Sequence, residues 1–485
     1  MNFRNKLFII SFIEGASVMA TEIGGAKLLA PFFGSSLYVW SSILSITLGG
    51  LAFGYFLGGK FSQKENRQTL LCYILILAFA FLAIIPILTY FIPFVALHFS
   101  LIPAVIISSI IIIFPSMSLM GTTSPLLVSL LTQHSTDSGF YSGKIYAIST
   151  VGGIISTFAC GFYLIPTVGI TNTLLLFALL LLLVSLLLLK KKTYKSLVSI
   201  LVIIIEVTGY SFKNSSNKNG TIYKEEGMLG TLEIRDEKNS DSVIVRRLYI
   251  NNIVQTEMNF KTKHTTSAYI SILESNLSLF HFKNALVLGL GGGLAANTLA
   301  EHSINVTGIE FDERVINCAK EYFNLIKSIN TICSDARFYL NNCKTKYDLI
   351  FFDLYKSEEQ PSHVITMESL KSIKNNLSDS AVIIINTHGY LNGNIGRGTQ
   401  CLLSTLKASG FNIKICTNTN DENYRNILVI ASIKKLNTNL NFEIPYTINK
   451  PEIVNTDNKP ILEKLNAEAN QAWRTNYLRN YILTH

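Results

Sequence analysis

The N-terminal part of the chain consists of long apolar segments joined by short polar stretches. The chain has 485 residues, of which 49% are hydrophobic and only 15% are charged. A helix of about 20 apolar residues crosses a bilayer. Segments of this kind lie at 7–30, 37–59, 69–92, 100–132, 145–166, 170–189 and 196–211. Because a bilayer offers no water to backbone groups, such segments must be helical. We therefore expect an α-helical transmembrane bundle of about seven helices over residues 1–211, with the fourth segment broken near Pro115 and Gly121.

The charges between these segments predict how they are oriented. Residues 1–211 contain eleven basic and five acidic residues. The basic residues gather before the first segment, around 60–67 and around 190–195, which indicates a cytoplasmic N-terminus. The net charge of +9 is thus no sign of nucleic-acid binding. The first segment lacks a small-residue cleavage site, so it is not a removable signal peptide. We expect an integral protein of the inner or plasma membrane of a bacterium.

The number of crossings decides on which side the C-terminal part lies. Seven crossings would leave it outside the cytoplasm. The segment 196–211 is short and contains Glu206, and the segment 100–132 is long enough to be miscounted, so the number of crossings stays open. We favour a cytoplasmic C-terminal domain.

The first apolar segment contains three ionisable residues, Glu14, Glu22 and Lys27. Such groups inside a membrane are functional candidates, for instance as a cation path or a substrate contact. Local pairing of Glu22 with Lys27 near an interface is the structural alternative.

In the second segment, Gly50, Gly54 and Gly58 recur every four residues. This spacing places a smooth ridge on one helix face, where we expect another helix to pack closely.

Beyond residue 211 the pattern changes to that of a water-soluble domain. Residues 212–222 are polar and predict a linker, and residues 223–284 alternate as strands of a small β-hairpin region. Strands and helices alternate over 285–435, which predicts an α/β Rossmann-like domain with a doubly wound parallel sheet. The tail, residues 436–485, ends in a predicted helix at 460–480. The seven cysteines have no metal-ligand spacing, so we expect neither a metal nor a disulfide framework.

The stretch from Ala285 to Glu310 predicts a nucleoside-binding half-site. An apolar strand runs into Gly289-Leu290-Gly291-Gly292-Gly293, and a second strand ends on Glu310. Side chains at the glycines would keep a ligand away from the backbone, and an acid ending the next strand can accept ribose hydroxyls. Two further acids follow later strands: Asp335, beside Ala336, and Asp353. Acids after successive strands fit S-adenosylmethionine-type chemistry better than hydride transfer.

These motifs resemble spermidine synthases, the polyamine aminopropyltransferase family, in the subfamily fused to a multi-span membrane domain. The membrane segment EGASVMATEIGGAKLLAPFF carries part of this resemblance. It implies a β-hairpin region followed by a methyltransferase-like Rossmann domain. It also implies roles for individual residues. Gly289, Gly291 and Gly293 would line the sulfonium-bearing end of the donor, Glu310 the ribose, and Asp335 with Ala336 the adenine. Asp353 would be the catalytic base, Gln255 a donor contact, and Tyr269 and Tyr355 acceptor contacts.

The chain also departs from the family pattern at the positions that would bind a diamine. The family places an acid where this chain has Gly292, and a second acid three residues after the catalytic one, where this chain has Lys356. Ile270 and Ser271 replace a histidine and a glutamate. Glu358 or Glu359 could compensate from the following loop, while His363 and Glu368 are more simply read as surface residues.

The resemblance therefore implies a membrane-bound transferase that moves an aminopropyl group from decarboxylated S-adenosylmethionine to a polyamine. Two alternatives stay open. One is a methyltransferase that uses S-adenosylmethionine on a membrane-delivered acceptor. The other is a polyamine or cation transporter or sensor with a regulatory nucleoside-binding domain. The expected partners are a small-molecule acceptor and membrane lipid, without nucleic acid, and a homodimer is left open.

Overall fold

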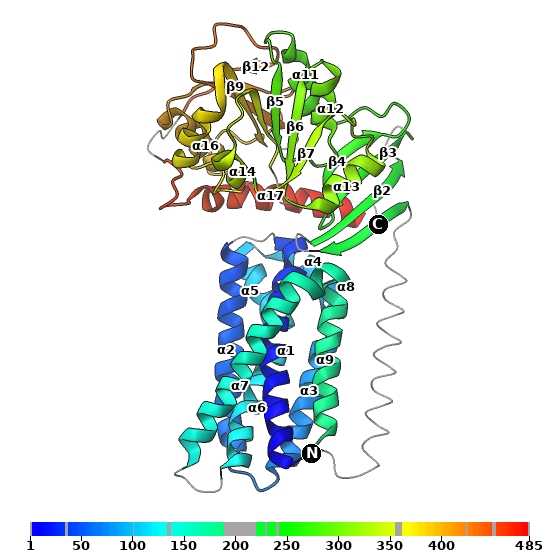
Figure 1. The fold of residues 1–485 in the computed structure, drawn as a ribbon, viewed down its shortest axis with the longest axis vertical. Coiled ribbons are helices and arrows are strands. Elements are labelled where there is room, and N and C mark those ends of the chain that lie inside the picture. The colour runs from blue at the N-terminus through cyan, green and yellow to red at the C-terminus, as the bar shows by residue number, and fades with distance from the viewer. Residues whose placement is uncertain are drawn as a thin grey trace. The chain divides into compact units, whose positions relative to one another are not determined.

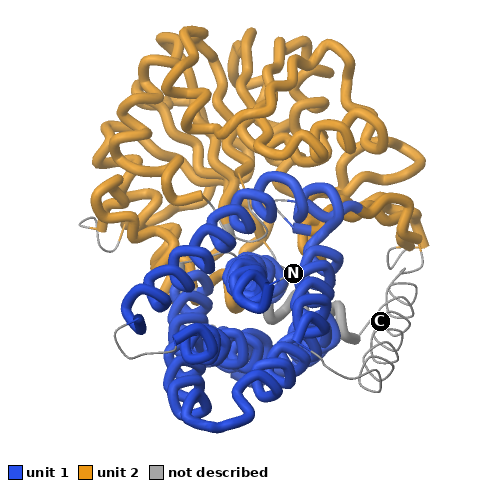
Figure 2. Tube along the Cα trace, turned by 60° about the horizontal axis from the view of Figure 1, so that its bottom comes forward, with its two compact units in different colours: residues 1–219, 225–230 blue, residues 220–224, 231–485 orange. Residues whose placement is uncertain are grey.

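The structure is a computed structural model of the chain. It describes residues 2–33, 37–99, 101–132, 137–188, 220–227, 230–238, 242–354, 361–422, 425–448 and 453–483. The chain divides into two compact units, coloured separately in Figure 2. Unit 1 is Met1–Asn219 with Glu225–Gly230, and unit 2 is Gly220–Lys224 with Thr231–His485. The expected segment 196–211 and residues 212–219 of the linker lie outside the described residues.

Unit 1 is helical throughout its described part before residue 189 (Figure 1). Its elements are α1 (Phe3–Phe33), α2 (Leu37–Phe61), α3 (Arg67–Leu88), η1 (Thr89–Phe91), α4 (Ile92–His98), α5 (Leu101–Ile112), α6 (Phe114–Leu131), α7 (Ser138–Ala159), η3 (Cys160–Leu164), α8 (Ile165–Val168) and α9 (Ile170–Leu186). Five stretches are long and apolar enough to cross a membrane, and α5 and α9 contribute shorter apolar helices. The fourth expected segment breaks at Ile113, two residues before Pro115, while Gly121 lies inside α6.

The glycine ridge of α2 packs against α6, as its spacing predicts. A Cβ atom at Gly54 would collide with the Ser118 carbonyl and with the backbone at Gly121, and one at Gly58 would meet the Thr122 carbonyl. The two backbones therefore touch along this seam. Gly49, on the same helix, has no atom within 4 Å of its Cβ position.

A four-stranded antiparallel sheet precedes the α/β part of the chain. It contains β1 (Thr221–Gly227), β2 (Gly230–Lys238), β3 (Ile244–Ile250) and β4 (Ile253–Asn259), in that order. Between β3 and β4 the chain folds back at Asn251 and Asn252. Both residues have positive φ, 53° and 62°, which asparagine tolerates better than most residues do. This turn makes a second hairpin.

The α/β part alternates helices and strands on an eight-stranded sheet. Its elements are α11 (Ala268–Leu277), β5 (Asn284–Leu288), α12 (Leu294–Glu301), β6 (Asn305–Glu310), α13 (Glu313–Tyr322), β7 (Asn330–Cys333), α14 (Ala336–Asn342), β8 (Tyr347–Phe352), α15 (Met367–Ile373), η4 (Lys374–Asn376), β9 (Leu377–His388), α16 (Arg397–Ala408), β10 (Asn412–Cys416), β11 (Asn426–Ser432), β12 (Glu443–Ile444) and α17 (Leu462–Leu483).

The strand order is β12-β10-β11-β9-β8-β5-β6-β7. The expectation of a parallel sheet is right for β5 to β9 and wrong for the remainder. β11 runs antiparallel to β9, and β10 is antiparallel to both β11 and β12. The physical reason is that β10 and β11 are joined by a short connection without a crossover helix, and such a connection makes a hairpin. The unit is a mixed α/β sheet of the methyltransferase-like type.

Both faces of the large sheet are buried. Successive residues of β8 alternate between two apolar cores: Leu349 and Phe351 belong to the core with α11 to α13, and Ile350 and Phe352 to the core with α14 to α17. Because side chains alternate along a strand, burial on both sides needs an unbroken apolar run. The sequence DLIFFD shows such a run, and Asp353 follows the strand directly.

We expect Gly54→Leu to lower the stability of unit 1 by about 1–3 kcal/mol, since overfilled helix contacts cost about that much. The melting temperature of the detergent-solubilised protein measures this effect. Gly49→Leu is the matched control on the same helix and should leave it unchanged. Equal losses for the two variants would contradict the assigned seam.

Candidate active site

The candidate site lies where the strand order of the sheet reverses direction. From β5 the chain proceeds outward to β6 and β7, and then returns to place β8 on the other side of β5. In open α/β sheets ligands bind at the carboxyl ends of the strands at such a switch point. Leu288 pairs with Phe352, so the segments that follow β5 and β8 leave the sheet side by side. They bring the glycine loop together with Asp353.

The glycine loop needs glycine for its backbone conformation. Gly289, Gly291 and Gly293 have φ values of 86°, 52° and 79°, in the left-handed region that other residues avoid. At Gly289 the reason is also steric, because a Cβ atom there would collide with the Asp353 carbonyl. The loop thus runs in contact with the chain that leaves β8.

Glu310 ends β6 and turns back toward the glycine loop. Its Oε2 accepts hydrogen bonds from the Leu290 and Gly291 N–H groups at 3.1 and 3.4 Å. Its Oε1 accepts bonds from Phe311 N–H and Asp312 N–H. Desolvation raises the pKa of Glu310 and outweighs these backbone hydrogen bonds, which lower it. The carboxylate therefore sits beside the loop, as a ribose-binding acid requires.

Asp335 and Ala336 begin α14 at the same edge of the sheet. Asp335 caps this helix, since its Oδ1 accepts the Phe338 N–H at 2.9 Å. Its Oδ2 lies 3.2 Å from His363 Nε2. Desolvation raises the pKa of Asp335, but the bonds from Phe338 and His363 outweigh it and leave the pKa below its ordinary value. Ala336 is the first helical residue, so its N–H has no acceptor within the helix. An ionised acid beside such an N–H suits the edge of an adenine.

Asp353 follows β8 and is held by two side-chain donors. Tyr269 Oη donates to its Oδ2 at 2.7 Å, and Asn386 Nδ2 donates to its Oδ1 at 2.8 Å. Asn386 Oδ1 in turn accepts a bond from Asn426 Nδ2 at 2.9 Å. Desolvation raises the pKa of Asp353, and the two donors only partly offset it, so the pKa stays above its ordinary value. A half-buried carboxylate fixed in this way can accept a proton from a ligand.

Sequence reasoning did not identify Asn386 or Asn426. Asn386 follows five apolar residues in AVIIIN, and a polar side chain near the end of a buried strand was an available signal. Asn426 carries no such signal, because its role depends on the antiparallel pairing of β11 with β9.

Gln255, predicted to contact the donor, and its neighbour Thr256 both lie on β4. Gln255 Nε2 donates long bonds of 3.4 Å to the carbonyls of Ile253 and Val254. Thr256 Oγ1 accepts the Gly292 N–H at 2.8 Å. Since neighbouring side chains of a strand point to opposite faces, Thr256 is the residue of β4 that contacts the loop.

The remaining acceptor-side residues are only partly described. Tyr355, Lys356, Glu358 and Glu359 lie outside the described residues. His363 contacts Asp335, and Glu368 Oε2 accepts the Asp457 N–H at 3.0 Å. Among the described residues, no group of three metal-ligating side chains is close enough to hold a metal.

The ionisable residues of α1 lie in unit 1. Glu14 is 2% exposed, and its Oε2 accepts a bond from Ser149 Oγ on α7 at 3.0 Å. Gly15 and Gly152 let the two helices approach there, because a Cβ atom at either would collide with the opposite backbone. Glu22 and Lys27 are half-buried further along α1.

Comparison with known proteins identifies the domain that carries this site. The spermine/spermidine synthase domain family matches residues 269–441, which run from Tyr269 to beyond β11. By this match, residues 269–441 resemble a spermine/spermidine synthase domain. A probable polyamine aminopropyl transferase of Bifidobacterium longum is 26% identical over 203 residues, which cover 41% of this chain and 44% of that protein.

Two further proteins are similar to parts of this chain. An N-terminal histidine N-methyltransferase of Emericella nidulans is 33% identical over 111 residues, 22% of this chain and 20% of that protein. The crystal structure of a probable spermidine synthase from Corynebacterium glutamicum aligns with a TM-score of 0.38 at 16% identity, over 46% of this chain and 82% of that one. This chain thus spans less than half the length of the two sequence relatives.

The space around Gly292 explains one departure from the synthase pattern. A Cβ atom at Gly292 would lie 2.6 Å from Thr256 Cγ2 and 3.1 Å from the Phe323 ring. The volume that an acid would need at this position is therefore filled by two apolar groups. The packing of the loop therefore leaves no room for this acid.

We expect Gly292→Asp to destabilise unit 2 by at least about 1–3 kcal/mol, because overfilling a packed site costs about that much and the carboxylate would be buried. Thermal unfolding of the full chain measures the loss. Gly139→Asp is the control, since nothing lies within 4 Å of a Cβ atom there. A stable Gly292→Asp variant would refute the assigned packing.

Asp353→Asn should raise the melting temperature at neutral and alkaline pH. The pKa of Asp353 is higher in the folded protein than its ordinary value, so its contribution to stability is lost as the pH rises through the folded pKa. The amide removes the cost of the buried charge, and the gain should shrink as the pH falls.

Asp348→Asn, at the other end of β8, is the control with the opposite sign. Desolvation raises the pKa of Asp348, but bonds from Ser378, Asn284 and Lys283 outweigh it and lower the pKa overall. This variant should lose stability above the ordinary aspartate pKa. Melting curves from pH 4 to 9 test both variants, and equal signs would contradict this account.

Proposed function

We propose that unit 2 transfers an aminopropyl group from decarboxylated S-adenosylmethionine to a polyamine or another amine acceptor. One observation carries the proposal: Asp353 is held by Tyr269 and Asn386 directly beside the glycine loop. The sulfonium end of an adenosyl donor on that loop would face this carboxylate. A spermine/spermidine synthase domain makes this reaction the first one to test.

The donor would lie along the carboxyl ends of β5, β6 and β7. Gly289, Gly291 and Gly293 allow close approach at the sulfonium end, Glu310 would accept the ribose hydroxyls, and Asp335 with Ala336 would meet the adenine. Phe311, directly after Glu310, is 52% exposed and offers an aromatic face to the purine. A ligand with an adenine, a ribose and a positive sulfonium would engage all of these groups.

In this reaction Asp353 would accept a proton from the acceptor nitrogen and orient that nitrogen for attack. The acceptor nitrogen attacks the carbon next to the sulfonium; the N–C bond forms, the C–S bond breaks, and methylthioadenosine leaves with the bonding electrons. The nitrogen gives up a proton, which Asp353 accepts. Because Asp353 is ionised only above a raised pKa, this step should slow as the pH falls through that value. Such a base contributes about 10²–10⁴-fold to the rate.

The identity of the acceptor is the second part of the proposal. Tyr269 contacts Asp353. From the family pattern we assign Tyr355 to the acceptor and Gln255 to the donor. The space around Gly292 is filled by other side chains. The chain therefore has no acid at this position to neutralise the distal end of a diamine. This observation favours a second candidate, methyl transfer from S-adenosylmethionine to an acceptor without that distal charge.

We further propose that residues 1–211 form the membrane domain, with 212–222 as linker, 223–284 as β-hairpin region, 285–435 as catalytic domain and 436–485 as tail. The catalytic domain would lie on the cytoplasmic side of the plasma membrane, where the donor is made. Glu14, Glu22 and Lys27 would contact a cation or the acceptor within the membrane domain.

Calorimetry of the full-length protein should show binding of decarboxylated S-adenosylmethionine and of methylthioadenosine. Tighter binding of S-adenosylmethionine than of its decarboxylated form would favour the methyltransferase candidate. Binding of none of the three would eliminate both transferases.

Asp353→Asn should lower aminopropyl transfer by about 10²–10⁴-fold with little change in donor affinity. Tyr269→Phe, which removes one of the two donors to Asp353, should have a smaller effect. Chromatographic detection of the aminopropylated product measures both. Retained turnover in Asp353→Asn would exclude Asp353 as the base.

A further inference from the structure

The chain beyond the spermine/spermidine synthase domain packs onto the rim of the candidate site. The domain ends at residue 441, and the described tail resumes at 453. Asn455 is fully buried. Its Nδ2 donates to the carbonyls of Ser362 and Ile365, at 3.0 and 2.7 Å, and its own carbonyl accepts the Met367 N–H at 2.8 Å. Asn455 thus holds the segment 362–367 at both ends: its side chain binds Ser362 and Ile365, and its main-chain carbonyl binds Met367.

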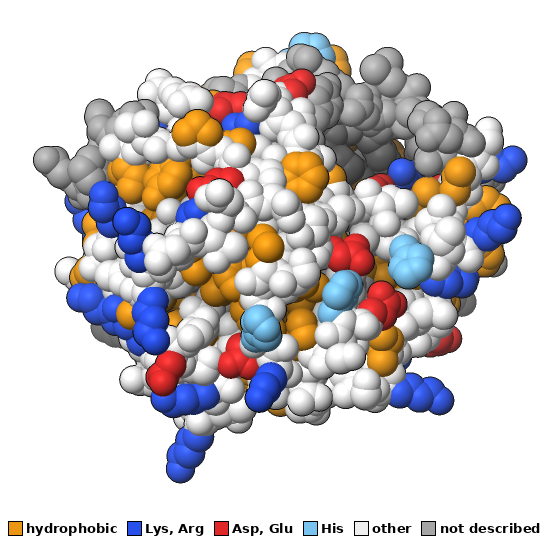
Figure 3. All heavy atoms as spheres, turned by 90° about the horizontal axis from the view of Figure 1, so that it is seen from above, with side chains coloured by type: hydrophobic (Ala, Val, Ile, Leu, Met, Phe, Trp, Pro, Cys, Tyr) orange, Lys and Arg blue, Asp and Glu red, His pale blue; other side chains and the backbone are white. Residues whose placement is uncertain are grey.

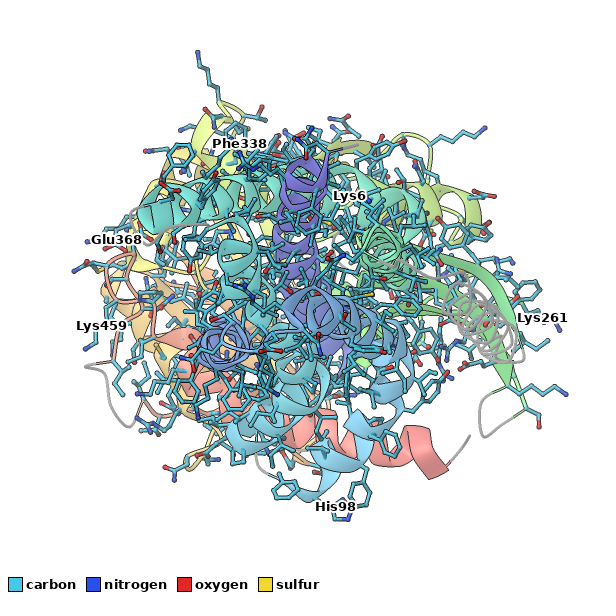
Figure 4. All side chains as sticks on the ribbon, turned by 90° about the horizontal axis from the view of Figure 1, so that it is seen from below. Lys6, His98, Lys261, Phe338, Glu368 and Lys459 are labelled. Carbon is cyan, nitrogen blue, oxygen red and sulfur yellow. The ribbon has the colours of Figure 1, made fainter. Side chains whose placement is uncertain are left out.

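A second contact ties the tail to the start of α14. Arg337 donates to both carboxylate oxygens of Asp457, at 2.7 and 2.6 Å. The same guanidinium donates to the His363 carbonyl at 2.9 Å. Asp457 N–H bonds to Glu368, which Figure 4 labels together with Lys459 of the tail. The tail, α14 and the segment 362–367 are therefore joined by one network of charged and polar groups.

This network ends at Asp335, the residue that we propose contacts the adenine. His363 Nε2 lies 3.2 Å from Asp335 Oδ2, while Phe338 N–H holds Oδ1. A carboxylate held at both oxygens keeps one orientation, and each oxygen retains a lone pair for a ligand. Preorganisation of this kind improves affinity, because the ordering cost is met before the ligand arrives.

We propose that the tail segment 453–462 is a positioning element of the nucleoside site: Asn455 and Asp457 hold His363 against Asp335 and thereby set the affinity for the adenine end of the ligand. The inference rests on the proposed donor site. Asn455 and Asp457 lie beyond residue 441, where the match to the synthase domain ends, so synthases without this tail would lack the device. Asp457 acts through His363 and contacts no reacting atom.

The test measures the affinity of the full-length protein for methylthioadenosine in a double-mutant cycle. Asp457→Ala and His363→Ala should each weaken binding about tenfold, and the double variant should be no weaker than the worse single one. Turnover at saturating donor should stay within about twofold of the unsubstituted protein, which a loss of folded protein would not allow. Glu443→Ala, which breaks the Lys414–Glu443 pair at 2.9 Å elsewhere in unit 2, is the matched control and should change nothing.

Several results would overturn the inference. Unchanged affinity in Asp457→Ala, or losses that multiply to about a hundredfold in the double variant, would show that Asp457 does not act through His363. If the unsubstituted protein binds methylthioadenosine but the Asp457 and His363 variants do not behave as predicted, the proposed donor site is retained and the positioning role of the tail is rejected. If the unsubstituted protein binds no nucleoside, the proposed function and this inference fail together. Hydrogen exchange of residues 361–366, faster in Asp457→Ala, gives a readout that needs no ligand.

Discussion

The direct contact between the glycine loop and the chain leaving β8 is the constraint on which the site depends. Parallel pairing of β5 with β8 brings their ends together, and Gly289 lets the two backbones touch. A side chain at Gly289 would push Asp353 away from the loop. The glycine loop, which we propose binds the donor, and the proposed base therefore share one strand junction, and neither can move without the other.

The groups around this junction are held from several layers of the fold. Asp353 is fixed by Tyr269 of α11 and by Asn386 of β9, and Asn426 extends the chain of bonds to β11. The antiparallel part of the sheet thus supports the carboxylate of its parallel part. On the face shown in Figure 3, acidic, basic and histidine side chains lie interspersed with apolar ones.

Much of this arrangement could be predicted from local sequence. The glycines of the loop and of the α2 ridge stand where only glycine fits the backbone. The acids stand where buried strands end. Both patterns can be recognised from neighbouring residues alone. The antiparallel edge of the sheet could not be predicted in this way, because it depends on which strands meet across the fold. Asn426 was missed for the same reason. The packing of Thr256 and Phe323 at Gly292 also depends on contacts distant in sequence, so the missing acid could be noticed but not explained.

The central claim is that Asp353 serves an adenosyl-sulfonium donor bound on the glycine loop. Its most direct test is the release of methylthioadenosine from decarboxylated S-adenosylmethionine by the purified full-length protein, with and without an amine acceptor. We predict release that requires the acceptor and that disappears when Asp353 is replaced by asparagine. Release without acceptor dependence, or equal release by both proteins, would contradict the account.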